Sequence, residues 1–169
     1  MLANDSNWAK AYARQALSDL NAREVLVAAG AEKCHRLHFL QMATEKSCKA
    51  YLTANNGHDQ VRKTHAYVAR VLPILARHFY ALENDGTSMA SWELSQVRKL
   101  AREIEVLAPA CDDGDTRNDN TEYPWLDTKG EIRTPCEHTF SGLDDGSRSI
   151  VRLIKLIRSA AYSLSDSND

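Results

Sequence analysis

The sequence contains no long hydrophobic run and no excess of charge of one sign. None of its apolar stretches approaches the roughly 20 residues that span a bilayer, and the first fifteen residues lack the apolar segment of a signal peptide. The net charge of −2, with 26% charged residues, excludes a chain that is strongly basic throughout and a disordered acidic one. These absences predict a cytoplasmic protein with no membrane partner, on which any nucleic-acid surface is local.

The four cysteines form no Cys-x-x-Cys pair. In a chain of 169 residues that is expected to be intracellular, an even cysteine count does not indicate disulfides, so we expect reduced thiols. The length suffices for one hydrophobic core without such cross-links. We therefore expect a single domain over residues 1–165.

The alternation of β-strands is also lacking, whereas five segments show helical periodicity. This pattern predicts an all-α fold, an antiparallel up-down bundle of about five helices, with Trp8 and Leu82 among the residues on the buried faces. Pro73 predicts a kink or a late start in the third helix. The expected helices run from after Ser6 to about Ala29, from Cys34 to about Asn55, from an N-cap at Thr64 through Leu82, from about Ser91 to before Pro109, and from about Ser147 to Leu164.

Residues 109–146 lack sustained periodicity, which is unusual for so long a stretch in a compact protein. The aromatic residues Tyr123, Trp125 and Phe140 favour docking on a core over disorder, because large rings gain free energy on burial. We expect a long ordered loop before the last helix, docked through Tyr123 and Trp125.

A cysteine and two histidines at the start of the second expected helix suggest a metal site. On a helix, Cys34 and His38 share one face while His35 points away. These are two ligands where a structural zinc site needs four, and the spacing of Cys136 and His138 matches no compact zinc module. The sequence predicts no metal, and nothing in it indicates a cofactor.

The stretch FLQMATEKSCKAYL, residues 39–52, combines an apolar start with a Gln, an Ala, a Glu-Lys pair and a Lys-Ala pair at fixed spacing. It resembles the second-helix signature of the HEPN superfamily. The matching positions are Gln41, Ala43, Glu45, Lys46, Lys49 and Ala50. The first expected helix resembles the pattern that precedes it in the superfamily, at Ala16, Asp19, Leu20 and Arg23, with the final Ala displaced to Ala22.

Two later elements extend the resemblance. His65 stands where a Thr-His element opens the third helix of HEPN proteins, and Tyr123 with Pro124 matches the centre of their Arg-Tyr-Pro-Asp element. Glu122 stands in place of the Arg, so a ligand role of that Arg is not carried over to this chain.

The resemblance implies a ligand groove or a dimer interface along one polar stripe of the second helix. The candidate ligand-binding residues are those of the stripe and the later tyrosine: His38, Gln41, Glu45, Lys49 and Tyr123. Judged from the residues alone, such a stripe is typical of a solvated or ion-paired helix face.

Catalytic HEPN proteins resemble metal-independent RNases in which an Arg stabilises phosphate charge and a His, a few residues later, acts as general base. Arg133 and His138 have this spacing. A single match is expected by chance in a chain with this many Arg and His residues, and Pro135 places it in the aperiodic loop rather than at a helix start. We therefore expect no catalytic residues, with Arg133 and His138 as the alternative.

The resemblance thus implies a non-catalytic, homodimeric binding module that binds a nucleotide or partners a small nucleotidyltransferase, in a toxin–antitoxin-like or stress-response system. Two alternatives stay open: a metal-independent endoribonuclease that cleaves RNA through Arg133 and His138, and a helical protein-interaction adaptor. The cations of the last helix are a further candidate for contact with a phosphate backbone, against their interpretation as a solvated face. They are Arg148, Arg152, Lys155 and Arg158.

Overall fold

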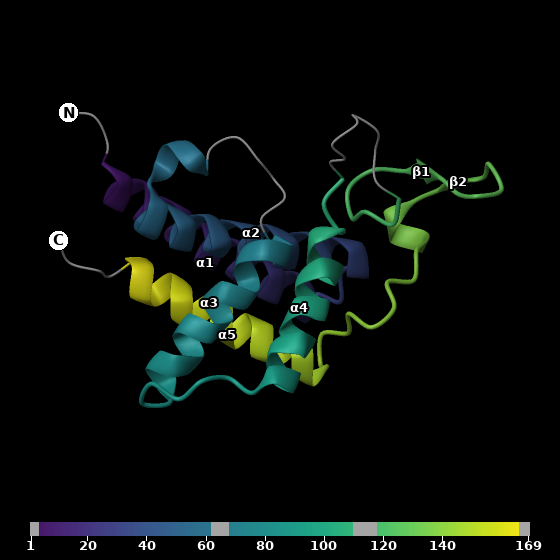
Figure 1. The fold of residues 1–169 in the computed structure, drawn as a ribbon. Coiled ribbons are helices and arrows are strands. Elements are labelled where there is room, and N and C mark those ends of the chain that lie inside the picture. Colours follow the sequence, from purple (N-terminus) through teal and green to yellow (C-terminus); the bar gives the residue numbers. More distant parts are fainter. Residues whose placement is uncertain (1–3, 62–67, 110–117, 166–169) are drawn as a thin grey trace.

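Five helices make up most of the described chain, which comprises residues 4–61, 68–109 and 118–165 of this computed structural model (Figure 1). The fold is an all-α helical bundle, which confirms the predicted fold class. The helices are α1 (Asp5–Ala28), α2 (Lys33–Asn56), α3 (Val68–Glu83), α4 (Ser91–Glu105) and α5 (Arg148–Ser165). Within these described ranges, no helix is both long and apolar enough to cross a membrane.

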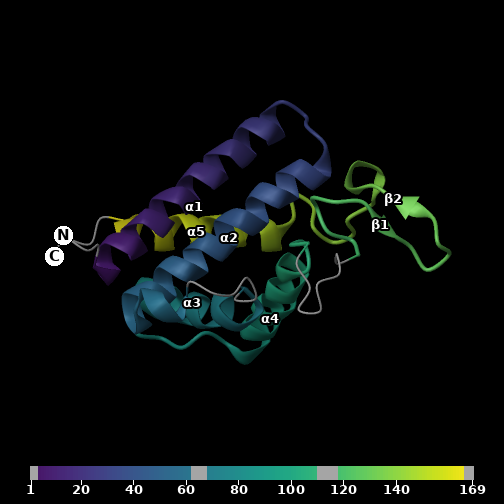
Figure 2. The ribbon, with the colours of Figure 1, turned by 90° about the horizontal axis from the view of Figure 1, so that it is seen from above.

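Helices α1 and α2 lie side by side and run antiparallel (Figure 2). The side chain of Asn4 caps α1 by accepting a hydrogen bond from the Asn7 N–H at 2.9 Å. Gly30, with φ of +65°, lies in the turn between the two helices, where a left-handed backbone favours glycine. Small buried residues line the contact and allow the helix axes to approach closely; they are Ala9, Ala13 and Ala16 of α1 and Ala43, Ser47 and Ala50 of α2.

Helix α2 is the central element of the bundle, because it contacts each of the other four helices. Leu37 and Leu40 are fully buried in the main hydrophobic cluster, to which α4 adds Ile104 and α5 adds Ile150 and Ile157. The helical periodicity therefore places the core faces of α4 and α5 correctly. Two expectations are wrong: Leu82, at the end of α3, and Trp8, in the first turns of α1, are exposed, because each lies near a helix end where neighbouring helices no longer cover it.

The expected start of the third helix lies outside the described residues. Helix α3 is described from Val68, so that Pro73 falls in its second turn, while Thr64 and His65 lie outside the described residues.

Between α4 and α5, the described residues 118–147 form an ordered but irregular segment. It contains a short antiparallel hairpin of β1 (Trp125–Leu126) and β2 (Ile132–Arg133), followed by the 3-10 helix η2 (Pro135–Glu137). The hairpin extends sideways from the helical bundle in both views (Figures 1 and 2). A second 3-10 helix, η1 (His58–Gln60), follows α2.

Trp125 and Phe140 anchor this segment. Both rings are buried, and Phe140 belongs to the main hydrophobic cluster. Docking through Trp125 is thus confirmed, whereas docking through Tyr123 is wrong, since 56% of Tyr123 is exposed. The reason is local. The side chain of buried Asn120 accepts a hydrogen bond from the Tyr123 N–H (2.7 Å) and donates one to the Tyr123 carbonyl (3.0 Å). The backbone of Tyr123 therefore docks, whereas its ring does not.

Candidate functional site

Three of the predicted ligand-binding residues on α2 form one chain of contacts. Gln41 Nε2 donates to Glu45 Oε2 at 3.0 Å, and Lys49 Nζ lies 2.6 Å from Glu45 Oε1. Only 2% of Gln41 and 7% of Glu45 is exposed. A buried carboxylate requires such partners, so these contacts are accounted for by the stability of α2 alone. The ligand-binding role of this stripe stays a prediction.

The other two predicted residues lie apart from this chain. His38 Nδ1 is 3.4 Å from Glu122 Oε1, so the side chain that replaces the Arg of the HEPN element faces the start of the stripe. The pair carries opposite charges only when the imidazole is protonated. The ring of Tyr123 is largely exposed, and its backbone is held by Asn120 as described above.

A second row of polar contacts joins α1 to α2. Lys46 Nζ lies 2.5 Å from Asp19 Oδ2, and Gln15 Nε2 donates to Asp19 Oδ1 at 3.1 Å. Asp19 and Lys46 are both among the residues on which the family resemblance rests. Part of that motif is thus explained by pairing between the first two helices.

Arg23 and Arg36 share the carboxylate of Asp145. Arg23 NH2 binds one oxygen of this carboxylate and Arg36 NH1 binds the other. Only 4% of Arg23 is exposed. Burial lowers the pKa of Arg23, and the charge of Asp145 opposes that shift. Sequence reasoning missed Asp145 and Arg36; the one available signal is that Arg23 follows Asp19 by one helical turn and so faces α2 with it.

In the hairpin, Arg133 is held by acidic side chains of its own turn. Its guanidinium lies 2.8 Å from Asp127 Oδ2 and 2.6 Å from Glu131 Oε2. Backbone N–H groups, first that of Glu131, hold the pKa of Asp127 below its usual range, and the bond to Asp127 raises the pKa of Arg133. These contacts keep the hairpin closed and the arginine charge neutralised.

His138, the other member of the RNase-like pair, has different partners. Its ring packs edge-on against the rings of Trp125 and Phe140. The distances between ring centroids are 5.3 Å and 4.7 Å. Its Nε2 lies 3.6 Å from Asp119 Oδ1. Arg133 and His138 are therefore each held by their own neighbours, Arg133 by the hairpin turn and His138 by an aromatic cluster.

The sequence predicts no metal site at the cysteines and histidines, and the surroundings of Cys34 bear on this prediction. Cys34 is buried, and burial raises the pKa of its thiol, which disfavours the thiolate that a metal requires. Cys34, Cys48 and Cys136 are free thiols. Across the described parts of the chain, no three His, Cys, Asp or Glu side chains gather as a metal site would require.

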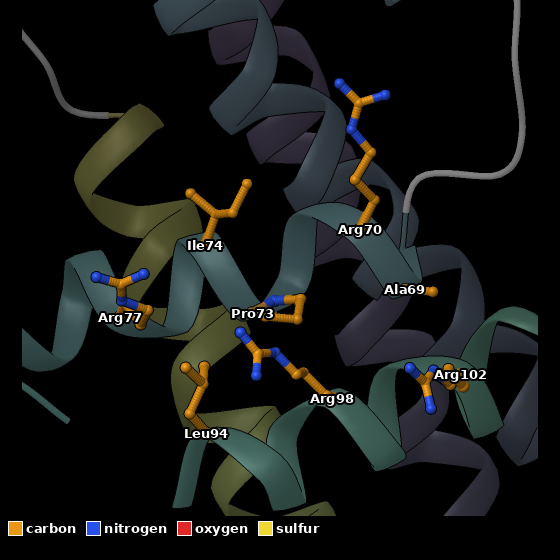
Figure 3. Close-up of a pocket in the computed structure, with 8 residues that line it drawn as sticks. All are labelled: Ala69, Arg70, Pro73, Ile74, Arg77, Leu94, Arg98 and Arg102. Carbon is orange, nitrogen blue, oxygen red and sulfur yellow. The ribbon is translucent and has the colours of Figure 1, made fainter. Parts of the chain in front are cut away.

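Sequence reasoning also missed a groove between α3 and α4, which has a volume of about 230 Å³ (Figure 3). Its apolar lining consists of Ala69, Pro73, Ile74 and Leu94, and its charged lining consists of Arg70, Arg77, Arg98 and Arg102. A signal was present in the spacing, because these arginines recur at seven and four residues on the polar edges of two consecutive helices. Their gathering depends on how the two helices pack.

The cationic residues of α5 differ in their surroundings. Arg158 pairs with Glu24 of α1, while Arg148, Arg152 and Lys155 are exposed. Their contact with a phosphate backbone stays a prediction.

Comparisons with protein-family models, with curated proteins and with solved structures found no match. The geometry itself defines the class: an all-α bundle with paired charges between its first two helices, a projecting hairpin and an arginine-lined groove.

Replacing Asp145 by Asn should lower the free energy of unfolding by about 3 kcal/mol, because it leaves Arg23 buried without its counter-charge. Urea denaturation followed by circular dichroism measures this change. Asp144→Asn is the matched control, since the Asp144 side chain is 75% exposed and its pair with Lys33, at 2.7 Å, should contribute at most about 1 kcal/mol. Equal losses in the two variants would contradict this structural role of Asp145.

Proposed function

We propose that the protein is a non-catalytic binding module of the HEPN type, which docks a partner protein through its hairpin. The resemblance implies a small nucleotidyltransferase as the class of partner. The observation that carries this proposal is an exposed apolar pair on the hairpin. Leu126 and Ile132 lie directly opposite each other across β1 and β2, and they are 61% and 73% exposed.

The position of this pair favours an intermolecular contact. The hairpin stands away from the helices (Figures 1 and 2), so that a partner reaches it without displacing the bundle. Charged Glu131 and Arg133 flank the pair. An apolar centre with a charged rim is the usual composition of a protein-binding hot spot.

The hairpin is also preorganised for binding. Asp127 Oδ1 accepts the N–H groups of Lys129 (2.8 Å) and Glu131 (3.0 Å), and Gly130 takes a φ of +77° in the turn. Together with the pairs of Arg133, these bonds fix the turn before a partner arrives. A rigid binding element loses less conformational entropy on association.

The contacts of Arg133 and His138 favour binding over RNA cleavage. An arginine that stabilises a developing phosphate charge must aim free N–H groups at the substrate, whereas Arg133 is engaged by two carboxylates. A general base must reach the attacking hydroxyl, whereas the ring of His138 lies between aromatic rings.

We expect no RNA cleavage that depends on Arg133 and His138. Single-stranded RNA incubated with the purified protein and a chelator should remain intact over hours, as judged on denaturing gels. Cleavage that falls by about 100-fold or more in His138→Ala, the loss typical of a removed general base, would contradict the non-catalytic function, provided that circular dichroism shows the variant folded.

The partner is tested with a purified small nucleotidyltransferase, the class that the resemblance implies. Titration calorimetry should detect a complex, and Leu126→Lys and Ile132→Lys should each weaken it at least about tenfold, since each places a charge in an apolar contact. Leu82→Lys is the matched control: it changes an equally exposed leucine on α3 and should bind as the unchanged protein does.

Absence of a complex, or equal affinities of all three variants, would contradict docking through the hairpin. A dimer of this chain that the hairpin variants convert to a monomer, as seen by light scattering, would instead assign the surface to self-association. The homodimer itself stays a prediction.

A further inference from the structure

The arginines of the groove between α3 and α4 lack acidic partners among the described residues, unlike the arginines that join α1, α2 and α5. Arg23, Arg36 and Arg158 each pair with a carboxylate. As far as the chain is described, Arg70, Arg77, Arg98 and Arg102 form no ion pair, although they line one groove. Four positive charges held together without counter-charges repel one another, and an anion relieves that repulsion.

Nearby carboxylates are engaged elsewhere. Glu105, three residues beyond Arg102, accepts a hydrogen bond from the Ala69 N–H at 3.1 Å and so caps the start of described α3. Glu103 lies 3.8 Å from Lys99. Neither of these two acidic residues lines the groove.

The guanidinium groups are spread out instead of converging on one point (Figure 3). Arg77 lies at one end, Arg98 extends from α4 across the middle towards Pro73, and Arg102 lies at the other end. The side chain of Arg70 extends from α3 away from those of Arg98 and Arg102. Seven residues of helix separate Arg70 from Arg77, which corresponds to about 10 Å along α3. A single phosphate occupies a fraction of this length, whereas a chain of several phosphates can follow it.

The rest of the lining indicates what the groove does not recognise. Its uncharged residues are aliphatic, namely Ala69, Pro73, Ile74 and Leu94. Among the described residues, no aromatic ring lines the groove, so they offer a nucleobase no stacking partner there. The volume of about 230 Å³ is also below that of pockets which enclose a whole small-molecule ligand.

We infer that this groove is a binding site for a chain of several phosphates. Arg77, Arg98 and Arg102 recognise it without regard to the base, and Arg70 lies at the rim. Arginine suits this task because its planar fork of N–H donors matches the oxygens of a phosphate. The phosphodiester backbone of single-stranded RNA and a free triphosphate chain share this chemistry. The site lies on α3 and α4 and uses no residue of the hairpin. Its test is therefore independent of the test of partner docking.

The experiment measures fluorescence anisotropy of a labelled oligouridylate RNA with the full chain, over a series of salt concentrations. Contact with three phosphates of a single strand should give a slope of about −2 for the logarithm of affinity against the logarithm of salt. Arg98→Gln and Arg102→Gln should each weaken binding and reduce the slope by about 1. Both arginines are exposed, so the variants should fold, which thermal unfolding verifies.

Lys99→Gln is the matched control. Lys99 is an exposed cation beside Arg98 on α4, but it does not line the groove. Its replacement removes the same charge from the protein and should leave both affinity and slope near those of the unchanged chain.

Unlabelled inorganic triphosphate distinguishes the two sources of phosphate. Displacement of RNA by triphosphate supports a groove that accepts a free chain; arginine-dependent RNA binding that triphosphate does not displace supports the phosphodiester backbone. Four results would overturn the site: binding of neither probe, equal effects of Lys99→Gln and Arg98→Gln, displacement by polyglutamate as effective as by triphosphate, or a tenfold preference between oligouridylate and oligoadenylate.

Discussion

The buried charge of Arg23 constrains how the helices assemble. A guanidinium that is almost fully removed from water needs an anion in contact, and the carboxylate of Asp145 supplies it. Arg36 binds the same carboxylate, so that α1, α2 and the chain leading into α5 meet at one point. The pair of Asp19 with Lys46 then fixes how α1 lies along α2.

This arrangement changes how the polar motif of α2 is understood. The residues that resemble a HEPN signature include Lys46, which pairs with α1, and Glu45, which binds Gln41 and Lys49 within α2. Because these charges are paired inside the bundle, their contribution to the stability of the fold is enough to explain the motif. We therefore propose that recognition of other molecules falls to other surfaces, namely the apolar pair of the hairpin and the arginine groove.

The helices and the buried faces of α4 and α5 could be predicted from the sequence, because helical periodicity is a local property and Ile104, Ile150 and Ile157 follow it directly. The contact of Arg23 with Asp145 joins residues that are 122 positions apart, so no local sequence pattern predicts it. Tyr123 was placed wrongly because the buried amide of Asn120, and not the apolar area of the ring, decides how that turn docks. The groove depends on the packing of α3 against α4, which periodicity does not specify.

The central claim is that α2 carries a structural polar stripe, whereas a ligand of phosphate chemistry meets α3 and α4. Nuclear magnetic resonance of the ¹⁵N-labelled chain, titrated with inorganic triphosphate, tests this most directly. The account predicts saturable shifts of backbone amides around Arg70, Arg98 and Arg102, and unchanged amides around Gln41 and Glu45. Shifts centred on Gln41 and Glu45, with the α3 and α4 amides unmoved, would contradict it.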